Sequence, residues 1–137
     1  MIHLIKLCVG AEKVEDLIDW QAAHYGAGPA RHVTRMAPKR AEEVLDGGSL
    51  YWVFKGVILA RQRILALDEI RGEDGIARCA IVLDREVVRT EGLSRRPFQG
   101  WRYLSAEDAP RDLAAGAVRA EVLPDALQAA LSEIGLR

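Results

Sequence analysis

Two stretches of this sequence interleave cations with aromatic side chains. One comprises residues 32–41, 49–56 and 61–63, and the other comprises residues 95–103. The planar guanidinium of arginine holds phosphate through paired hydrogen bonds, and aromatic rings stack on the faces of single-stranded bases. We therefore predict a nucleic-acid-binding surface formed by Arg35, Lys39, Arg40, Tyr51, Lys55, Arg61, Gln62, Arg63, Arg95, Arg96, Gln99, Trp101, Arg102 and Tyr103.

The side chains of this predicted surface divide into three roles. The cations would hold phosphates, and Tyr51, Trp101 or Tyr103 would stack on a base. Gln62 or Gln99 would read the edge of that base through hydrogen bonds. The partner predicted from these roles is RNA or a nucleotide, and its binding should weaken steeply as salt is added.

Two features of the same residues have simpler explanations. The chain has 15 arginines and only 4 lysines, a ratio that GC-rich coding sequence would also produce. Phe98 and Trp101 would equally pin a long irregular loop to the hydrophobic core. These interpretations stand beside the binding surface, because an aromatic ring can pack against a core and still offer one face to a ligand.

Catalytic motifs are weak in this sequence. The GGSLY run at residues 47–51 lacks the closing glycine of a hydrolase nucleophile elbow, and it precedes a strand-like segment instead of following one. The GEDG run at residues 72–75 places acids where a phosphate-binding loop needs free amides or cations. We assign no catalytic residue and favour a binding protein over an enzyme. An enzyme acting on a nucleotide or a phosphorylated metabolite is the alternative, and its candidate residues are His32, Asp46, Ser49 and Glu69.

The residues that most often bind metals are scattered along the chain. His3, His24 and His32 lack the close spacing of zinc motifs. Cys8 and Cys79 both lie in apolar runs, which is typical of buried free thiols, with a disulfide or a metal pair as the alternative. We predict neither a metal nor a cofactor.

The composition is that of one soluble globular domain spanning residues 1–137. Half of the residues are hydrophobic and 28% are charged, so the chain can bury a core without a disulfide or a metal. No apolar run approaches the ~20 residues of a membrane span, and the first residues do not resemble a signal peptide. We therefore predict a bacterial cytoplasmic protein. The net charge is only −1, but residues 31–102 carry fourteen basic and ten acidic side chains.

Hydrophobic periodicity predicts an α+β fold. The expected strands are residues 2–9, 32–36, 50–59, 61–70, 76–83, 86–90 and 117–122, and the expected helices are residues 14–24, 38–45 and 124–134. We also expect a hairpin turn at residues 72–75 and a capped helical turn at residues 105–110. This order of elements favours a mixed, curled β-sheet or a small β-barrel with short flanking helices.

Alternation along the predicted strands indicates which side chains face solvent. Within residues 50–59, Tyr51 and Lys55 are expected to face outward while Trp52 and Phe54 fill the core.

The next predicted strand, residues 61–70, carries two arginines that alternation places together. Arg61 and Arg63 should share a face, about 6–7 Å apart along the strand. The same alternation predicts that Leu65 and Leu67 lie on the same face of the strand as Arg63.

Five motifs resemble the bacterial domain of unknown function 1489 family. They are IHLIKLCVG at residues 2–10, HVTRM at 32–36, LDGGSLYWV at 45–53, ARQRIL at 60–65 and PFQGWRYL at 97–104. The resemblance covers nearly the whole chain, and the main departure is a short loop at residues 25–31. The family carries no known activity, so the resemblance implies membership without a function.

A second resemblance concerns the fold. The opening of PUA-like and ASCH-like domains is similar to one part of this sequence: a helix ending at residues 46–48, an aromatic strand, and a following strand with Arg61 and Arg63. Residues 100–109 are similar to the closing segment of those domains. Those domains are small curled β-barrels with flanking helices, commonly tied to RNA or modified nucleotides. The resemblance implies the same kind of partner by analogy of fold.

An interaction protein without a ligand is a further alternative. The acidic, alanine-rich helix expected near the C-terminal end, residues 125–133, would dock on another protein or on a second copy of the chain. An apolar stripe left exposed on that helix would favour this alternative.

Overall fold

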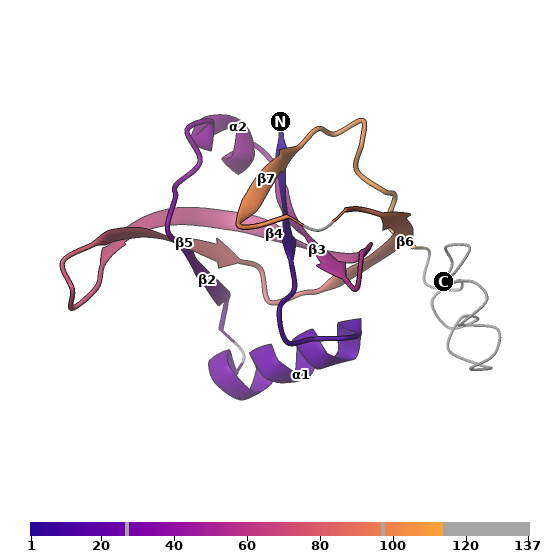
Figure 1. Ribbon diagram of the computed structural model, residues 1–137, viewed down its shortest axis with the longest axis horizontal. Coiled ribbons are helices and arrows are strands. Elements are labelled where there is room, and N and C mark those ends of the chain that lie inside the picture. Colours follow the sequence, from indigo (N-terminus) through magenta and orange to yellow (C-terminus); the bar gives the residue numbers. More distant parts are fainter. Residues whose placement is uncertain (27, 97, 114–137) are drawn as a thin grey trace.

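The computed structural model describes residues 1–26, 28–96 and 98–113, which form a mixed β-sheet with two helices (Figure 1). The elements in chain order are β1 (His3–Leu7), α1 (Val14–Tyr25), β2 (Ala30–Thr34), α2 (Ala41–Leu45), β3 (Ser49–Phe54), β4 (Val57–Arg71), β5 (Ala77–Leu83), β6 (Val88–Ser94) and β7 (Trp101–Leu104). The predicted α+β class and curled mixed sheet are confirmed. The strand and helix expected at residues 117–122 and 124–134 lie outside the described residues.

The sheet is built around the 15-residue strand β4. Its first half pairs with β3 and β6, and its second half pairs with β5. Six strands follow the order β2-β5-β4-β3-β1-β7, and β6 pairs with β4 beside them. β1 runs parallel to β3, whereas the other pairs are antiparallel. The two ends of this path are therefore β2 and β7, which are far apart in the sequence.

A β-bulge in β4 helps to curl the sheet. The pairing with β5 shifts register between Ile64 and Ala66, and such an irregularity bends and twists a strand. Leu67 packs against the same core as Ile64, whereas Leu65 is 49% exposed. The prediction that Leu65 and Leu67 share a face is wrong, because the extra residue shifts the alternation by one position.

Both faces of β3 are buried. Trp52 and Phe54 belong to the larger core cluster inside the curl, while Tyr51 and Val53 belong to a smaller cluster on the other face. None of the four is more than 4% exposed. The prediction that Tyr51 faces solvent is wrong, because Leu104 of β7 and its neighbours cover the second face.

β3 and β4 form a hairpin where the sequence predicts a single strand over residues 50–59. Lys55 and Gly56 turn the chain, with φ angles of 48° and 85°. Positive φ at both central residues defines the type I′ turn, whose twist matches that of the flanking strands. Lys55 is exposed at this turn, as predicted. The turn is hard to recognise because lysine, unlike Asn or Asp, is not typical of its first central position.

Two other local predictions are confirmed, and the helix expected at residues 38–45 is shorter, covering Ala41–Leu45. α1 coincides with the helix expected at residues 14–24, and the hairpin turn at residues 72–75 joins β4 to β5. Residues 105–110 form turns without a helix, although the amide of Asp108 does donate to the Ser105 hydroxyl. Within the ranges that the structure describes, we find no helix long and apolar enough to span a bilayer.

α1 closes one end of the curled sheet (Figure 1). Val14 and Leu17 of this helix pack into the larger core cluster. Deeper in the core, the amides of Gln21 in α1 and Gln62 in β4 exchange two hydrogen bonds of 3.0 and 2.7 Å. The indole of Trp52 donates a further bond of 2.9 Å to Gln62. These hydrogen bonds hold α1 against β3 and β4.

Candidate functional site

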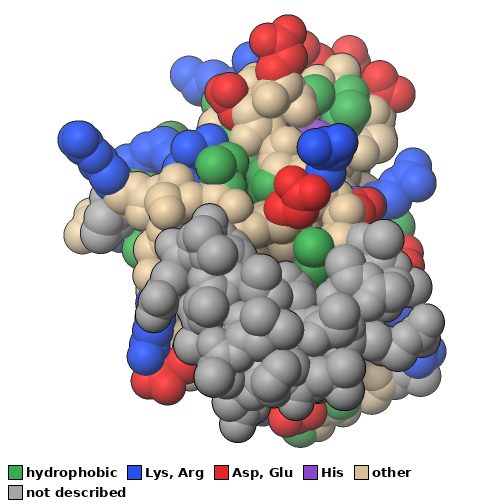
Figure 2. Space-filling model, turned by 90° about the vertical axis from the view of Figure 1, so that its right-hand side faces the viewer, with side chains coloured by type: hydrophobic (Ala, Val, Ile, Leu, Met, Phe, Trp, Pro, Cys, Tyr) green, Lys and Arg blue, Asp and Glu red, His purple; other side chains and the backbone are tan. Residues whose placement is uncertain are grey.

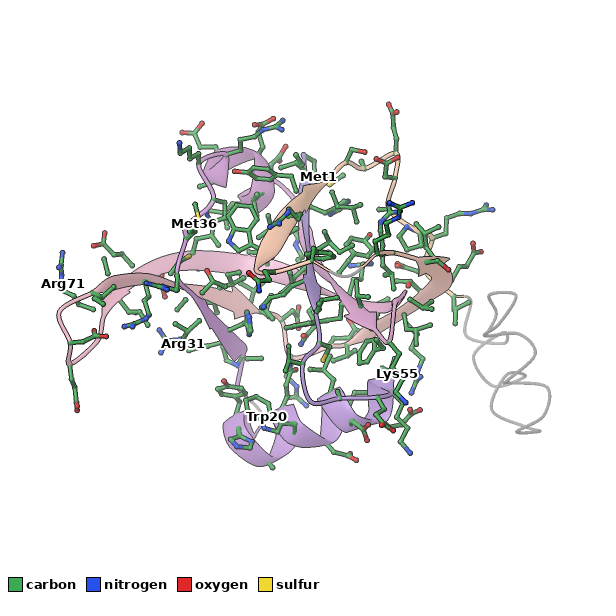
Figure 3. The ribbon with its side chains drawn as sticks, in the orientation of Figure 1. Met1, Trp20, Arg31, Met36, Lys55 and Arg71 are labelled. Atoms are coloured by element: carbon green, nitrogen blue, oxygen red, sulfur yellow. The ribbon has the colours of Figure 1, made fainter. Side chains whose placement is uncertain are left out.

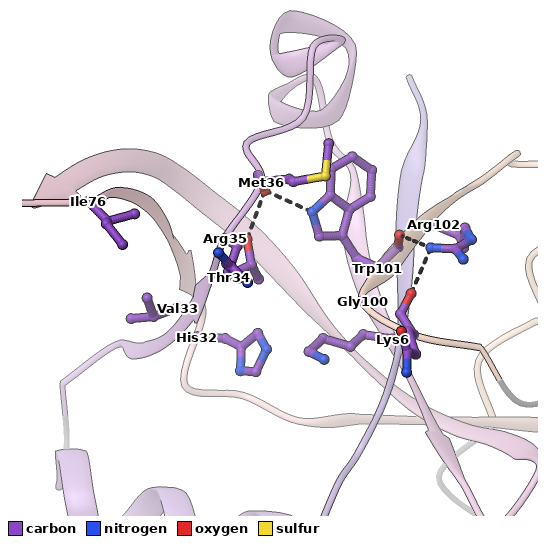
Figure 4. A pocket seen from close by; sticks show the side chains of 11 residues that line it. Lys6, His32, Val33, Thr34, Arg35, Met36, Ile76, Gly100, Trp101 and Arg102 are labelled. Atoms are coloured by element: carbon purple, nitrogen blue, oxygen red, sulfur yellow. Dashed lines mark hydrogen bonds between the residues drawn. The ribbon is translucent and has the colours of Figure 1, made fainter. Parts of the chain in front are cut away.

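The curl brings the two edges of the sheet, β2 and β7, to face each other. Trp101 Nε1 donates a 2.8 Å hydrogen bond to the carbonyl oxygen of Met36, just beyond β2. Further inside, the ring of His32 in β2 meets Trp52 edge to face, with 5.3 Å between the ring centroids. A cleft of about 860 Å³ lies between the edges (Figure 4).

Eleven residues line this cleft, mainly from β1, β2 and the β7 region. They are Lys6, His32, Val33, Thr34, Arg35, Met36, Ile76, Gln99, Gly100, Trp101 and Arg102. Three of them are cations and none is a carboxylate, so the described lining of the cleft carries a positive fixed charge. The chain as a whole has a net charge of −1. The local excess of positive charge is therefore produced by the folding of the sheet.

Lys6 and His32 point toward each other inside the cleft (Figure 4). Lys6 follows Leu4 on the inward face of β1, and His32 lies between the buried residues Ala30 and Thr34 on β2. Burial, together with the charge of Lys6, lowers the pKa of His32 to about 4. The imidazole is therefore neutral at pH 7. Its Nε2 atom is buried and has no hydrogen-bond partner in the described part of the chain.

One backbone carbonyl organises the end of the cleft next to β7. The oxygen of Met36 accepts hydrogen bonds from the Thr34 hydroxyl and from the Trp101 indole, each 2.8 Å long. Tyr103 packs edge-on against the same indole, with 5.0 Å between the ring centroids. The Trp101 ring is thus held in one orientation at the cleft, and a ligand that stacks on it would not have to order it.

Four of the residues predicted from the sequence line the cleft, namely Arg35, Gln99, Trp101 and Arg102. The guanidinium of Arg102 donates to the carbonyls of Gln99 and Trp101, at 2.7 and 3.1 Å, and lies over the Phe98 ring. Phe98 packs against the smaller core cluster. The interpretation of Phe98 as a loop anchor is therefore confirmed.

Arg61 and Gln62 are engaged in contacts within the protein. Arg61 donates two hydrogen bonds to the carboxylate of Asp112, at 2.7 and 2.6 Å, and a third of 3.0 Å to the Ser49 hydroxyl. Hydrogen bonding to Arg61 lowers the pKa of Asp112. Gln62 is completely buried. The prediction that Gln62 reads the edge of a base is wrong, because its side chain does not reach solvent.

The remaining predicted residues lie outside the cleft. The exposed ones are Lys39, Arg40, Lys55, Arg63, Arg96 and Tyr103, whereas Arg95 is partly buried. Arg40 pairs with Glu43, and Lys55 pairs with Glu12. Figure 2 shows cations and carboxylates interspersed over the described part of one face. The predicted residues are thus distributed over several parts of the molecule, and binding by those outside the cleft stays a prediction.

Sequence reasoning missed Lys6 and Thr34, and it considered His32 only as a catalytic or metal-binding candidate. Lys6 carried a usable signal, because it is a charged residue between the aliphatic residues Ile5 and Leu7 and alternates with the buried Leu4. Thr34 and His32 carried no such signal. A short strand with both polar and apolar residues does not indicate which other strand its side chains will face in a curled sheet.

The two cysteines do not form a site. Both are free, and burial raises the pKa of the Cys8 thiol to about 11 and also raises that of Cys79. A thiol with a raised pKa is a poor nucleophile at neutral pH. Across residues 1–26, 28–96 and 98–113, no three His, Cys, Asp or Glu side chains gather closely enough to hold a metal ion.

One family matches almost the whole chain. Its model, described as "Protein of unknown function (DUF1489)", covers residues 4–137. No curated protein and no solved structure matches the chain. The predicted resemblance to this family is confirmed, whereas the resemblance to PUA-like and ASCH-like domains stays a prediction.

Proposed function

This chain belongs to the family described as protein of unknown function DUF1489, and we propose that it binds a nucleotide unit in the cleft between β2 and β7. Such a unit is an aromatic base joined to a phosphate, and it presents the same chemistry in RNA and in a free nucleotide. The proposal keeps the partner predicted from the sequence but replaces a broad surface with one cleft.

The cationic lining of the cleft carries this proposal. Lys6, Arg35 and Arg102 contribute positive charge, and no carboxylate among the lining residues offsets it. Lys6 is partly buried and its side chain extends into the cleft, where a charge pair is screened less than in open solvent. A phosphate is the anionic group that accompanies an aromatic ring in every nucleotide.

Two further groups suit the base. The indole of Trp101 offers a fixed aromatic surface at the cleft. The buried Nε2 of His32 has no partner among the described residues, and leaving such an atom unpaired costs about 1–3 kcal/mol. Because this atom is buried, a base would reach it only after the side chains around it shift, and a donor or acceptor on the edge of the base would then recover part of this cost.

Catalysis is less well supported than binding. A general base works best when its pKa is near the working pH, and the pKa of His32, about 4, is far below neutrality. The Thr34 hydroxyl donates to a backbone carbonyl, and Ser49 is only 2% exposed. Asp46 and Glu69 do not line the cleft.

Titration with adenosine 5′-monophosphate and with a short single-stranded RNA tests the proposal, using quenching of tryptophan fluorescence. Lys6→Gln should weaken binding of both by roughly tenfold and reduce the salt dependence. Arg71→Gln removes the same charge near the distant hairpin tip (Figure 3) and should change little. Equal affinities of Lys6→Gln and Arg71→Gln would show that the cleft is not the site.

A further inference from the structure

A second cavity adjoins the cleft. It has a volume of about 360 Å³ and is lined by α1, the end of β1 and the segment that joins them. Lys6 and His32 line both cavities, so the two spaces meet at these side chains. In Figure 3, Arg31 of β2 lies toward Trp20 of α1, whereas Met36, just beyond the other end of β2, lies farther from Trp20.

Trp20 is an exposed aromatic ring in the wall of this second cavity. It is 50% exposed, although its large apolar surface would normally favour burial. The ring of His24 stacks on one face of Trp20 with a centroid distance of 3.9 Å, and Tyr25 packs against it edge-on. His24 Nδ1 also donates a 2.8 Å hydrogen bond to the Trp20 carbonyl. These contacts hold the exposed indole in place without burying it.

The charge of the second cavity also suits a phosphate chain. Lys6 and Arg31 line it, and Asp16 is the only carboxylate among the described residues of its lining. Asp16 accepts hydrogen bonds from the amides of Glu12 and Lys13, at 3.0 and 3.2 Å, so it is engaged at the start of α1. A ligand with two phosphate groups would therefore contact cations in both cavities.

We propose that the two cavities form one groove that binds at least two consecutive nucleotides of single-stranded RNA. One base stacks on Trp101 in the cleft, and the next base lies against Trp20 in the second cavity. Lys6, which lines both cavities, holds the phosphate that joins the two nucleotides. The strand is single because the bases of a duplex are stacked on one another and offer no free faces to these rings. This inference rests on the proposed function and adds that the ligand is a strand.

The experiment measures the affinities of adenosine 5′-monophosphate, 5′-phosphorylated diadenylate and 5′-phosphorylated tetraadenylate for the full chain by calorimetry at low salt. Stacking of one base on an aromatic ring changes affinity by about 5- to 150-fold. The dinucleotide should therefore bind more tightly than the mononucleotide by a factor in this range. Trp20→Ala should remove that gain and leave the mononucleotide unchanged, whereas Trp101→Ala should weaken all three ligands.

The outcomes separate this inference from the proposed function. If Trp101→Ala weakens all three ligands and Trp20→Ala changes none, the extended groove is refuted and the cleft stands. If neither substitution matters, or if none of the ligands binds, both proposals fall. An equal loss of mononucleotide and dinucleotide affinity in Trp20→Ala would show that this residue acts through the fold, which also overturns the inference.

Two further variants guard against a loss of structure. Ile18→Ala removes a partly exposed apolar side chain from the same helix, outside the second cavity, and should bind all three ligands as the wild type does. Trp20→Tyr keeps an aromatic ring and should restore most of the gain of the dinucleotide. Thermal melts of every variant show that the compared proteins are folded.

Discussion

At the scale of single residues, the cleft depends on two polar side chains at inward-facing positions. Lys6 and His32 stand where the neighbouring inward residues of their strands, such as Leu4 and Ala30, are apolar and buried. Burying polar groups costs free energy unless partners offset it. A protein that needed only stability would place apolar side chains at both positions, and this supports a binding role for them.

We expect the free energy of unfolding to fall as the pH drops from about 6.5 to about 4. The pKa of His32 in the folded state, about 4, lies below its ordinary value of 6.5. In this window the unfolded chain binds a proton that the folded chain does not bind. The loss from His32 should be about 1–3 kcal/mol after allowance for solvent screening. His3, whose pKa is lowered by burial and by Arg61, acts in the same direction.

Urea unfolding at several pH values between 7 and 4 measures this loss. His32→Gln should make the free energy of unfolding less dependent on pH. His24→Gln replaces an exposed histidine of α1 and serves as the matched control for the loss of a histidine. Identical pH profiles for the wild type and His32→Gln would contradict the assignment.

At the scale of secondary structure, the hairpin of β3 and β4 decides the shape of the sheet. Its type I′ turn at Lys55 and Gly56 starts β4, which then pairs with three different strands. The bulge after Ile64 redirects β4 toward β5. β2 pairs with β5, so its position depends on the direction of β4. Without the bulge, β2 would not face β7.

Lys55→Asn should stabilise the protein by about 0.5–1 kcal/mol, because Asn tolerates the positive φ at this position far better than lysine. The lost ion pair with Glu12 is exposed on both sides and contributes little. The shift in the urea midpoint measures the gain. Lys39→Asn, at an exposed position outside the hairpin, is the control and should give no gain. A lower midpoint for Lys55→Asn would argue against the turn.

At the scale of the whole molecule, long-range polar contacts hold the curled sheet and its helix together. Trp101 and Met36 join the two edges of the sheet, and Gln21 and Gln62 join α1 to β4. The partners in each contact are 65 and 41 residues apart in the sequence. Both cavities therefore exist only when these distant segments are in place.

Gln62→Leu should destabilise the protein by about 2–5 kcal/mol, since it leaves the Gln21 amide and the Trp52 indole unpaired in the core. Replacing both glutamines by leucine should cost less than the sum of the two single changes, because one unpaired amide is removed with its partner. Chemical unfolding of the two single variants and the double variant gives the coupling. Strictly additive costs would show that the two amides do not interact.

Much of the local structure was predictable from the sequence, because strands and helices follow from patterns within about ten residues. The helix at residues 14–24 and the turn at 72–75 are examples. The turn at Lys55 and the bulge after Ile64 were not predictable from these patterns. Each interrupts a run with strong β propensity by one or two residues, and tertiary pairing decides where the interruption falls.

Part of the lining of the proposed site was recognisable in the sequence as arginine mixed with aromatic residues, and Arg35, Gln99, Trp101 and Arg102 do line the cleft. Lys6 carried only the signal of a charge among aliphatic residues and His32 carried none, and their meeting was not recognisable because three strands separate β1 from β2 in the sheet path. Composition and alternation establish what each strand can bury and which face is polar. Which polar faces meet depends on strand order and curl, and these are decided by contacts between segments dozens of residues apart.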